Sequence, residues 1–245
     1  MEKTNQEFLA EDLKFLGFGE TLKTSLGEAM ANNETSFELY FAGEIGFEPL
    51  HAILYFTKTD PKGFFFFSGY QLALDNKLQY FKIFKGKGVT LKEGFNLLCG
   101  RAVFKQLIGK NGQKYDAWMQ LDFNIKEGEN FKVNTYFGSH SYNLSSSLDE
   151  LGIQPPSSNW DRQMLLRSLE RGNLQSGFIT ENGELKEVLI EANPKEKTVT
   201  IRDSFLPGGT NPVVESPAAI SSPGTKNAEN MQDKKNLRSK KSKDL

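Results

Sequence analysis

Apolar residues near the start of the chain recur three or four positions apart, which is the spacing of one face of a helix. The first predicted helix begins at a capping box of Thr4 and Glu7, in which each side chain bonds the backbone of the other residue, and it ends at Gly17. Its predicted core-facing residues are Phe8, Leu9, Leu13 and Leu16. A second helix is predicted over 22–32 from the four-residue spacing of Leu22, Leu26 and Met30.

The pattern then changes to runs that are rich in aromatic and β-branched residues and bounded by Gly, Pro or Asp. Such runs are typical of strands, which we expect over 37–41, 51–57, 63–70 and 78–84. The four consecutive phenylalanines at 64–67 indicate a strand that is buried on both faces.

The same order of helix and strands recurs in the middle of the chain. A second capping box, Thr90 with Glu93, predicts a short helix that ends at Gly100. Strands are expected after it over 101–108, 114–123 and 131–137. The pair Asn111-Gly112 predicts a hairpin turn between the first two of these strands, because both residues tolerate positive φ.

A third round of the pattern follows. Ser147 and Glu150 predict the cap of a short helix, Pro155-Pro156 is a break, and a further helix is expected over 160–169. Its strands are predicted over 173–180, 184–191 and 198–203. The fold class is therefore α+β, with antiparallel sheet or sheets built from helix-then-meander units and with helices packed on them.

The aromatic residues all lie at or before Phe205. After it the chain is rich in Pro, Gly, Ser and Lys, a composition that buries too little apolar surface to offset the entropy of ordering. We therefore predict a helical N-terminus with a first meander over 1–87, two further units over 88–205, and a disordered basic tail over 206–245. The second region either forms one continuous domain with the first or stands apart from it.

The single cysteine, Cys99, excludes an internal disulfide, and its leucine neighbours predict a thiol buried in the core. The N-terminus has no basic region followed by an apolar run, so no signal peptide is expected. No stretch approaches the roughly 18 apolar residues that span a bilayer. The prediction is a soluble, cytoplasmic protein with no membrane partner.

Catalytic and cofactor signatures are missing from the sequence. The chain has two histidines, His51 and His140, without a His or Cys partner at metal-ligand spacing. Gly86-Lys87-Gly88 lies between a strand and a helix but lacks the third glycine of a dinucleotide loop. We therefore predict no catalytic residue, metal site or cofactor. An enzyme with an unrecognised site around either histidine is the remaining alternative.

Charge is distributed unevenly beneath a near-neutral total. Residues 77–114 carry a net charge of +8, because they include nine basic residues and a single acidic residue, Glu93. The segments 1–76 and 115–205 carry net charges of −7 and −5. A basic stripe is typical of nucleic-acid binding, and this one is interleaved with Tyr80, Phe81 and Phe84, whose rings could stack on bases. The candidate DNA- or RNA-binding residues are Lys77, Lys82, Lys85, Lys87, Arg101, Lys105, Lys110 and Lys114. Alternatively, the stripe pairs with the acidic flanks, within the chain or across a dimer.

Three segments resemble a protein family of Bacteroides-type bacteria that is often encoded on conjugative or other mobile elements and has no established function. They are Leu13-Lys14-Phe15-Leu16-Gly17-Phe18-Gly19-Glu20, the region from Gly88-Val89-Thr90 to Arg101-Ala102-Val103, and Gly172-Asn173-Leu174-Gln175-Ser176. The resemblance runs from about residue 13 to about residue 203 and implies an accessory role on a mobile element, without implying an activity. The leading hypothesis is a non-enzymatic accessory or interaction protein that binds a protein partner. Nucleic-acid binding through 77–114 and the tail is the alternative, and the oligomeric state is left open.

Overall fold

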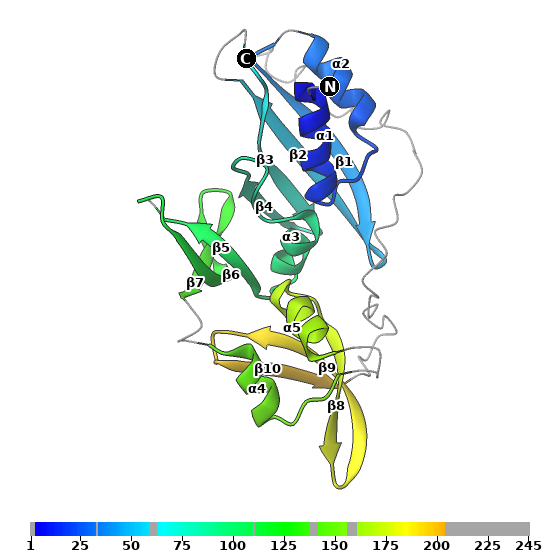
Figure 1. Ribbon diagram of the computed structural model, residues 1–245, viewed down its shortest axis with the longest axis vertical. Coiled ribbons are helices and arrows are strands. Elements are labelled where there is room, and N and C mark those ends of the chain that lie inside the picture. The colour runs from blue at the N-terminus through cyan, green and yellow to red at the C-terminus, as the bar shows by residue number, and fades with distance from the viewer. Residues whose placement is uncertain are drawn as a thin grey trace, which may run out of the picture.

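The computed structural model describes residues 3–32, 34–58, 63–109, 111–137, 142–155 and 161–203. These residues form five helices and ten strands, and the strands make three antiparallel sheets. The predicted α+β class is confirmed, and so is the thrice-repeated order of helix followed by meander. Figure 1 shows the three sheets following one another along the long axis of the molecule. The tail predicted over 206–245 lies outside the described residues.

The first unit is a four-stranded meander with helices on one face. Its strands are β1 (Ser36–Ile45), β2 (Glu48–Thr57), β3 (Phe66–Leu74) and β4 (Lys77–Lys82), which pair in chain order. The helices α1 (Asn5–Phe15) and α2 (Lys23–Ala31) lie in front of this sheet (Figure 1). The capping box of Thr4 and Glu7 is present as predicted.

Helix α3 (Leu91–Leu98) lies between the first sheet and the second and is buried along most of its length. Its predicted capping box of Thr90 and Glu93 is confirmed. The fully buried Tyr70 donates to the carbonyl oxygens of Val89 and Thr90, each at 2.9 Å, and so holds the start of the helix against β3. Gly94 permits this close approach, because a Cβ there would lie 2.9 Å from the Tyr70 hydroxyl oxygen.

The second sheet contributes to two hydrophobic cores. It consists of β5 (Val103–Ile108), β6 (Lys114–Glu127) and β7 (Asn130–Phe137), with β6 in the centre. One face joins the core formed with α1, α2, α3 and the first sheet, through Val103, Met119, Leu121, Phe131 and Val133. The opposite face joins the core of the C-terminal unit, through Ala102, Phe104, Trp118 and Tyr136. This alternation explains why three meanders form one stack.

The C-terminal unit contains α4 (Leu144–Glu150), α5 (Arg162–Glu170), β8 (Gln175–Glu181), β9 (Glu184–Asn193) and β10 (Thr198–Asp203). Strand β9 is central in its sheet. Helix α4 contacts β10, and α5 contacts β5, β8 and β9. Helix α5 therefore links the second and third sheets, and Figure 1 shows it at this junction.

Four local predictions are wrong, and three of them concern burial, which depends on residues that pack from elsewhere in the chain. Phe8 is exposed rather than core-facing, and Cys99 caps the end of α3 with its side chain exposed rather than buried. The phenylalanines at 64–67 alternate instead of being buried on both faces, with Phe65 4% and Phe66 54% exposed. Helix α4 is capped by the Asn143 side chain, three residues before Ser146, and not by Ser147.

The longest helix in the described part of the chain is α1, with 11 residues. A helix that crosses a bilayer needs about 20 predominantly apolar residues. No described helix therefore has the length and apolar character that a membrane crossing requires.

Candidate functional site

The structure separates the eight predicted nucleic-acid-binding residues into two groups. Lys77, Arg101 and Lys105 are half-buried and bonded to the protein, whereas Lys82, Lys85, Lys87 and Lys114 are exposed. Lys110 lies outside the described residues. The net charge of 77–114 therefore overstates the charge that a ligand would meet.

Lys105 and Lys77 bond to either end of α3. The Lys105 ammonium lies 2.9 Å from the Glu93 carboxylate, which also accepts from the Thr90 N–H. Lys77 donates to the carbonyl oxygen of Leu98 at 2.8 Å. A cation near the last carbonyls of a helix is favourable because those groups carry the negative end of the helix dipole. Both lysines therefore stabilise α3, and this role accounts for their positions without a ligand.

Arg101 joins α3 to the C-terminal unit. Its Nε donates to the carbonyl oxygen of Gly172 at 2.8 Å, and its Nη2 donates to the Asn96 side-chain oxygen. Asn96 in turn donates to the Arg171 carbonyl at 2.8 Å and to the Asn173 side chain at 3.0 Å. A buried polar network of this kind is costly to leave partly satisfied, so its members are positioned for folding rather than for a ligand.

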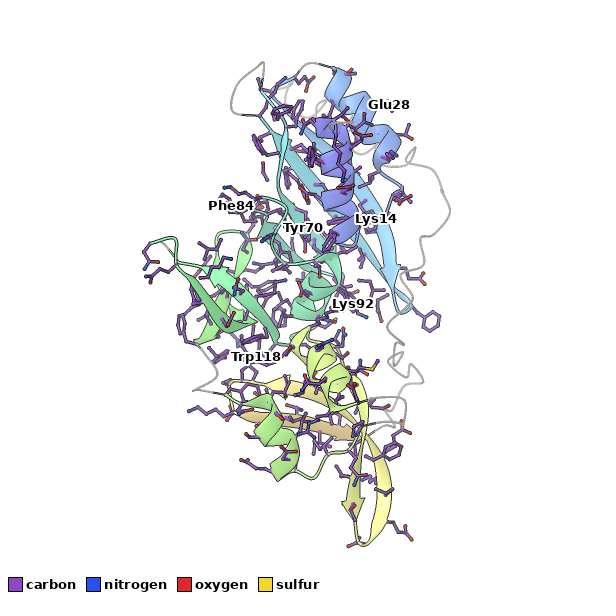
Figure 2. The ribbon with its side chains drawn as sticks, viewed as in Figure 1. Lys14, Glu28, Tyr70, Phe84, Lys92 and Trp118 are labelled. Atoms are coloured by element: carbon purple, nitrogen blue, oxygen red, sulfur yellow. The ribbon has the colours of Figure 1, made fainter. Side chains whose placement is uncertain are left out.

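The exposed lysines after β4 surround a phenylalanine. Phe84 is 54% exposed, and Lys82, Lys85 and Lys87 are exposed on both sides of it in the sequence. A tight turn fixes this segment, since the N–H groups of Phe84 and Lys87 each donate to the carbonyl of the other, at 2.9 and 3.0 Å. The Lys85 ammonium lies 5.4 Å from the centre of the Phe84 ring. Figure 2 shows Phe84 to the left of Tyr70, at the side of the first sheet.

Gly86 anchors this turn on helix α1. A Cβ at Gly86 would lie 2.3 Å from the Asp12 carboxylate, so a larger residue there would require the Asp12 side chain to move. Its φ of +67° also lies in the left-handed region that glycine favours. Burial raises the pKa of the Asp12 carboxyl, and the neighbouring Glu11 raises it further. The segment between β4 and α3 is therefore a hydrogen-bonded turn whose lysines are exposed.

No described helix covers the face of the first sheet that points away from α1, α2 and α3, and this face is rich in tyrosine. Tyr40, Ile53, Gln71 and Tyr80 lie opposite one another across the four strands in turn. Tyr40 is 58% exposed, and the others are half-buried. In the neighbouring row, Glu38, Tyr55, Gly69 and Lys82 lie opposite one another. The alternation of β4 places Lys82 on the same face as Tyr80.

Gly69 allows two of these tyrosines to meet. A Cβ at Gly69 would lie 2.3 Å from the Tyr80 hydroxyl oxygen, so the Tyr80 side chain crosses over β3 in the space that glycine leaves. The ring centres of Tyr55 and Tyr80 are 5.9 Å apart. Burial raises the pKa of both phenols, so they are neutral near pH 7. The result is a half-exposed aromatic pair beside Lys82.

The aromatic residues of this face are only partly those expected from the sequence. Tyr80 and Phe84 are accessible as predicted, but Phe81 is buried in the first core. Tyr40 and Tyr55 were not expected at a site. In the sequence, Phe37, Leu39 and Phe41 alternate with Glu38 and Tyr40, and this alternation could have placed Tyr40 on the outer face. The largely apolar run around Tyr55 carries no such signal.

The two histidines provide no evidence of a catalytic site in the described part of the chain. His51 is exposed on β2, and His140 lies outside the described residues. The described residues contain no group of three His, Cys, Asp or Glu side chains that could hold a metal ion. The Cys99 thiol is accessible, but desolvation by its surroundings raises its pKa despite the nearby Arg101 and Lys77, which disfavours the reactive thiolate.

A cleft of about 280 Å³ lies between the start of β5 and the third sheet. Its lining is polar and includes Arg101, Gln120, Glu191, Asn193, Thr200 and Arg202. These groups already have partners: Gln120 donates to the Gly100 carbonyl at 2.8 Å, Asn193 donates to Thr200 at 3.1 Å, and Arg202 pairs with Glu191. The cleft is therefore a polar contact region between two units, in which these side chains bond to other groups of the protein.

The three segments that carry the family resemblance meet at joints of the fold. The Leu91 N–H donates to the Leu16 carbonyl at 2.8 Å, which joins the first segment to the second. Asn96 and Asn173 join the second to the third. These contacts give the three segments a role in packing. The exposed turn at Phe84 is not part of any of them. Comparison with protein-family models, with curated proteins and with solved structures finds no match to this chain, so the family resemblance stays a prediction.

Proposed function

We propose that this chain is a non-enzymatic protein that binds single-stranded nucleic acid. The binding surface consists of the turn at Phe84 and the adjoining part of the uncovered sheet face at Tyr55, Tyr80 and Lys82. The observation that carries the proposal is the juxtaposition of accessible aromatic rings with three exposed lysines on one hydrogen-bonded turn and the end of β4.

The chemistry of this surface fits unpaired bases better than a duplex. Bases that are splayed from a single strand stack on aromatic side chains, and lysines neutralise the phosphates between them. The surface is the face of a sheet with no protruding helix, so nothing on it is shaped to enter a major groove. A partly exposed tyrosine pair with a cation beside it therefore supports stacking and phosphate contact together.

The acidic side chains confine the proposed surface to one end of the sheet. Glu38 and Glu44 lie along β1, and Tyr40 donates to Glu38 at 3.3 Å. Lys82 ends β4 on the opposite side of the sheet. Phosphates would be repelled from Glu38 and from Glu129, both of which raise the pKa of Tyr55, and attracted to the end of β4. The proposed strand path therefore runs from Tyr55 on β2 over Tyr80 to the lysines of the turn.

The proposal is compatible with an accessory role on a mobile element, where single-stranded DNA is an intermediate of transfer. The Lys-rich segment over 234–243 would add sequence-independent affinity for any polyanion. The contributions of tail and turn are separable, because neutralising each changes a different set of charges.

The test is a salt titration of the binding of fluorescent single-stranded DNA and RNA oligonucleotides to the full chain. Replacing Lys82, Lys85 and Lys87 by Ala should lower the slope of log affinity against log salt by about 2, since each phosphate contact on a single strand contributes about 0.7. Lys114→Ala, an exposed lysine on β6, is the matched control and should leave the slope within about 0.2 of the unmodified protein's.

An aromatic variant completes the test. Phe84→Ala should weaken binding by about 5- to 100-fold, the range expected for one stacked base. Phe47→Ala is its control, because Phe47 is 80% exposed at the β1–β2 turn, at the opposite end of the sheet. The proposal is rejected if the full chain binds neither nucleic acid, or if only the neutralisation of Lys234, Lys235, Arg238, Lys240, Lys241 and Lys243 abolishes binding.

A further inference from the structure

Strand β1 is a ten-residue edge strand with one side unpaired in the described part of the chain. The Lys58 N–H donates to the Thr35 carbonyl, and Ile45 and Glu48 close the hairpin, so the odd-numbered residues of β1 direct their backbone groups at β2. The N–H and C=O groups of the alternate residues point away from the sheet. These residues are Ser36, Glu38, Tyr40, Ala42 and Glu44. Figure 1 shows no other described strand beside this edge.

The opposite edge of the same sheet is closed. Strand β4 is covered by β7, where Asn130 accepts from the Tyr80 N–H at 2.7 Å and Gln79 accepts from the Phe131 N–H at 2.8 Å. Natural edge strands are usually protected by lysine, proline or a bulge. Strand β1 has no lysine or proline, and its register with β2 is unbroken. It is therefore a long, regular edge that is ready to pair.

We propose that β1 pairs antiparallel with β1 of a second copy of this chain, about a two-fold axis at Tyr40. A two-fold axis perpendicular to the sheet requires that each residue face a residue of the same parity, because side chains on opposite strands must share a face. With Tyr40 opposite Tyr40 of the second copy, Glu38 faces Ala42 and Ser36 faces Glu44 of the other copy. All the outward-pointing residues of both strands are then hydrogen-bonded.

Charge distinguishes this register from its neighbours. Moving the axis to Phe41 places Glu38 opposite Glu44 twice over, and like charges directly opposite are destabilising. Moving it to Leu39 places Glu34, which precedes the strand, opposite Glu44. The register centred on Tyr40 is the one among these that uses the whole strand and opposes no two carboxylates. This self-complementarity favours a second copy over an unrelated strand as the occupant.

The pairing also continues the two faces of the sheet. On the inner face, the buried Leu39 would lie opposite the half-buried Phe41 of the other copy. On the uncovered face, the two Tyr40 rings would lie side by side, and cross-strand aromatic pairs are stabilising. The arrangement is isologous, so it closes at a dimer and does not propagate into fibres. It is independent of the nucleic-acid surface, which lies at the other side of the sheet.

Charge substitutions at Ala42 test both the dimer and its register. Ala42 is exposed, so these variants should fold. In sedimentation velocity of the full chain between about 1 and 100 µM, Ala42→Glu should weaken dimerisation by about 2- to 30-fold, because it places a carboxylate opposite Glu38 twice. Ala42→Lys should strengthen it by a similar factor, and Glu38→Lys combined with Ala42→Glu should restore it.

Cross-linking provides a second measurement that does not depend on affinity. In a Cys99→Ser background, Tyr40→Cys should form a disulfide-linked dimer under mild oxidation, because hydrogen-bonded opposite residues have Cα atoms about 5.5 Å apart. Glu44→Cys is the control and should not cross-link, since it faces Ser36 of the other copy. The proposal is overturned if the full chain is monomeric throughout this range. It is also overturned if Ala42→Glu and Ala42→Lys shift dimerisation alike, or if only Glu44→Cys cross-links.

Discussion

The Phe131 N–H donates to the side-chain oxygen of Gln79 at 2.8 Å, which ties the first sheet to the second through two buried residues that are 52 positions apart. The neighbouring pair is reciprocal, with Asn130 accepting from the Tyr80 N–H. Side-chain amides here take the place of a strand ladder. They close the edge of β4 and set the position of β7 beside it, and this edge is where the proposed nucleic-acid surface begins.

Replacing Gln79 by Ala should destabilise the protein by about 1–3 kcal/mol, because the buried Phe131 N–H would lose its acceptor. Urea unfolding followed by tryptophan fluorescence measures the change. Gln71→Ala, on the uncovered face of the adjacent strand, should cost less than about 0.5 kcal/mol. If the two variants lost the same free energy of unfolding, the hydrogen bond from Phe131 to Gln79 would make no specific contribution to stability.

The two helical glycines should respond oppositely to alanine. Alanine normally favours a helix by about 1 kcal/mol over glycine, but at Gly94 its Cβ would meet Tyr70, Phe81 and Leu72 within 3.1 Å. Gly94→Ala should therefore destabilise by about 1–3 kcal/mol through overpacking.

Gly27→Ala in α2 is the matched variant. Its Cβ would meet only the flexible end of Gln6, so a gain of up to about 1 kcal/mol is expected in the same urea assay. A loss at Gly27 as large as that at Gly94 would contradict the packing argument.

Arg101→Ala should loosen the connection between the first two sheets and the C-terminal unit. It leaves the Gly172 carbonyl and the Asn96 side chain without their donor, at an expected cost of about 1–3 kcal/mol. Arg101→Lys should rescue little of this, because a single ammonium does not reproduce the two-pronged contact. Arg202→Ala is the comparison: it removes a half-exposed arginine that pairs with Glu191 within one sheet, so it should cost less than Arg101→Ala, which breaks a connection between two units.

The effect of Asp12 on stability should depend on pH. Desolvation raises the pKa of its carboxyl in the folded protein, so folding favours the protonated form. The contribution of Asp12 to stability is therefore most favourable below its unfolded pKa of about 3.8, and it is lost as pH rises through the folded pKa. Asp12→Asn should raise the melting temperature at pH 7, and the two curves should converge below about pH 3.8.

Glu28→Gln, on the exposed side of α2, is the control for this series and should change the melting temperature little at any pH. A gain for Asp12→Asn that persists unchanged at low pH would exclude the linkage to protonation.

Much of the local structure could be predicted from sequence because its causes are local. The two capping boxes and the strand runs depend on neighbours within a few positions. The errors at Phe8, Phe64–Phe67 and Cys99 concern burial instead. Burial depends on what packs over a residue, and those neighbours come from elsewhere in the chain.

The candidate site divides in the same way. The sequence by itself determined that residues 77–114 are strongly basic and that aromatic residues lie among them. Only the tertiary structure decided that Lys105 is paired with Glu93, that Arg101 is bonded to Gly172, 71 positions away, and that Lys82, Lys85 and Lys87 stay accessible. The physical reason is that charge is a property of each residue, whereas its availability depends on partners that folding brings together.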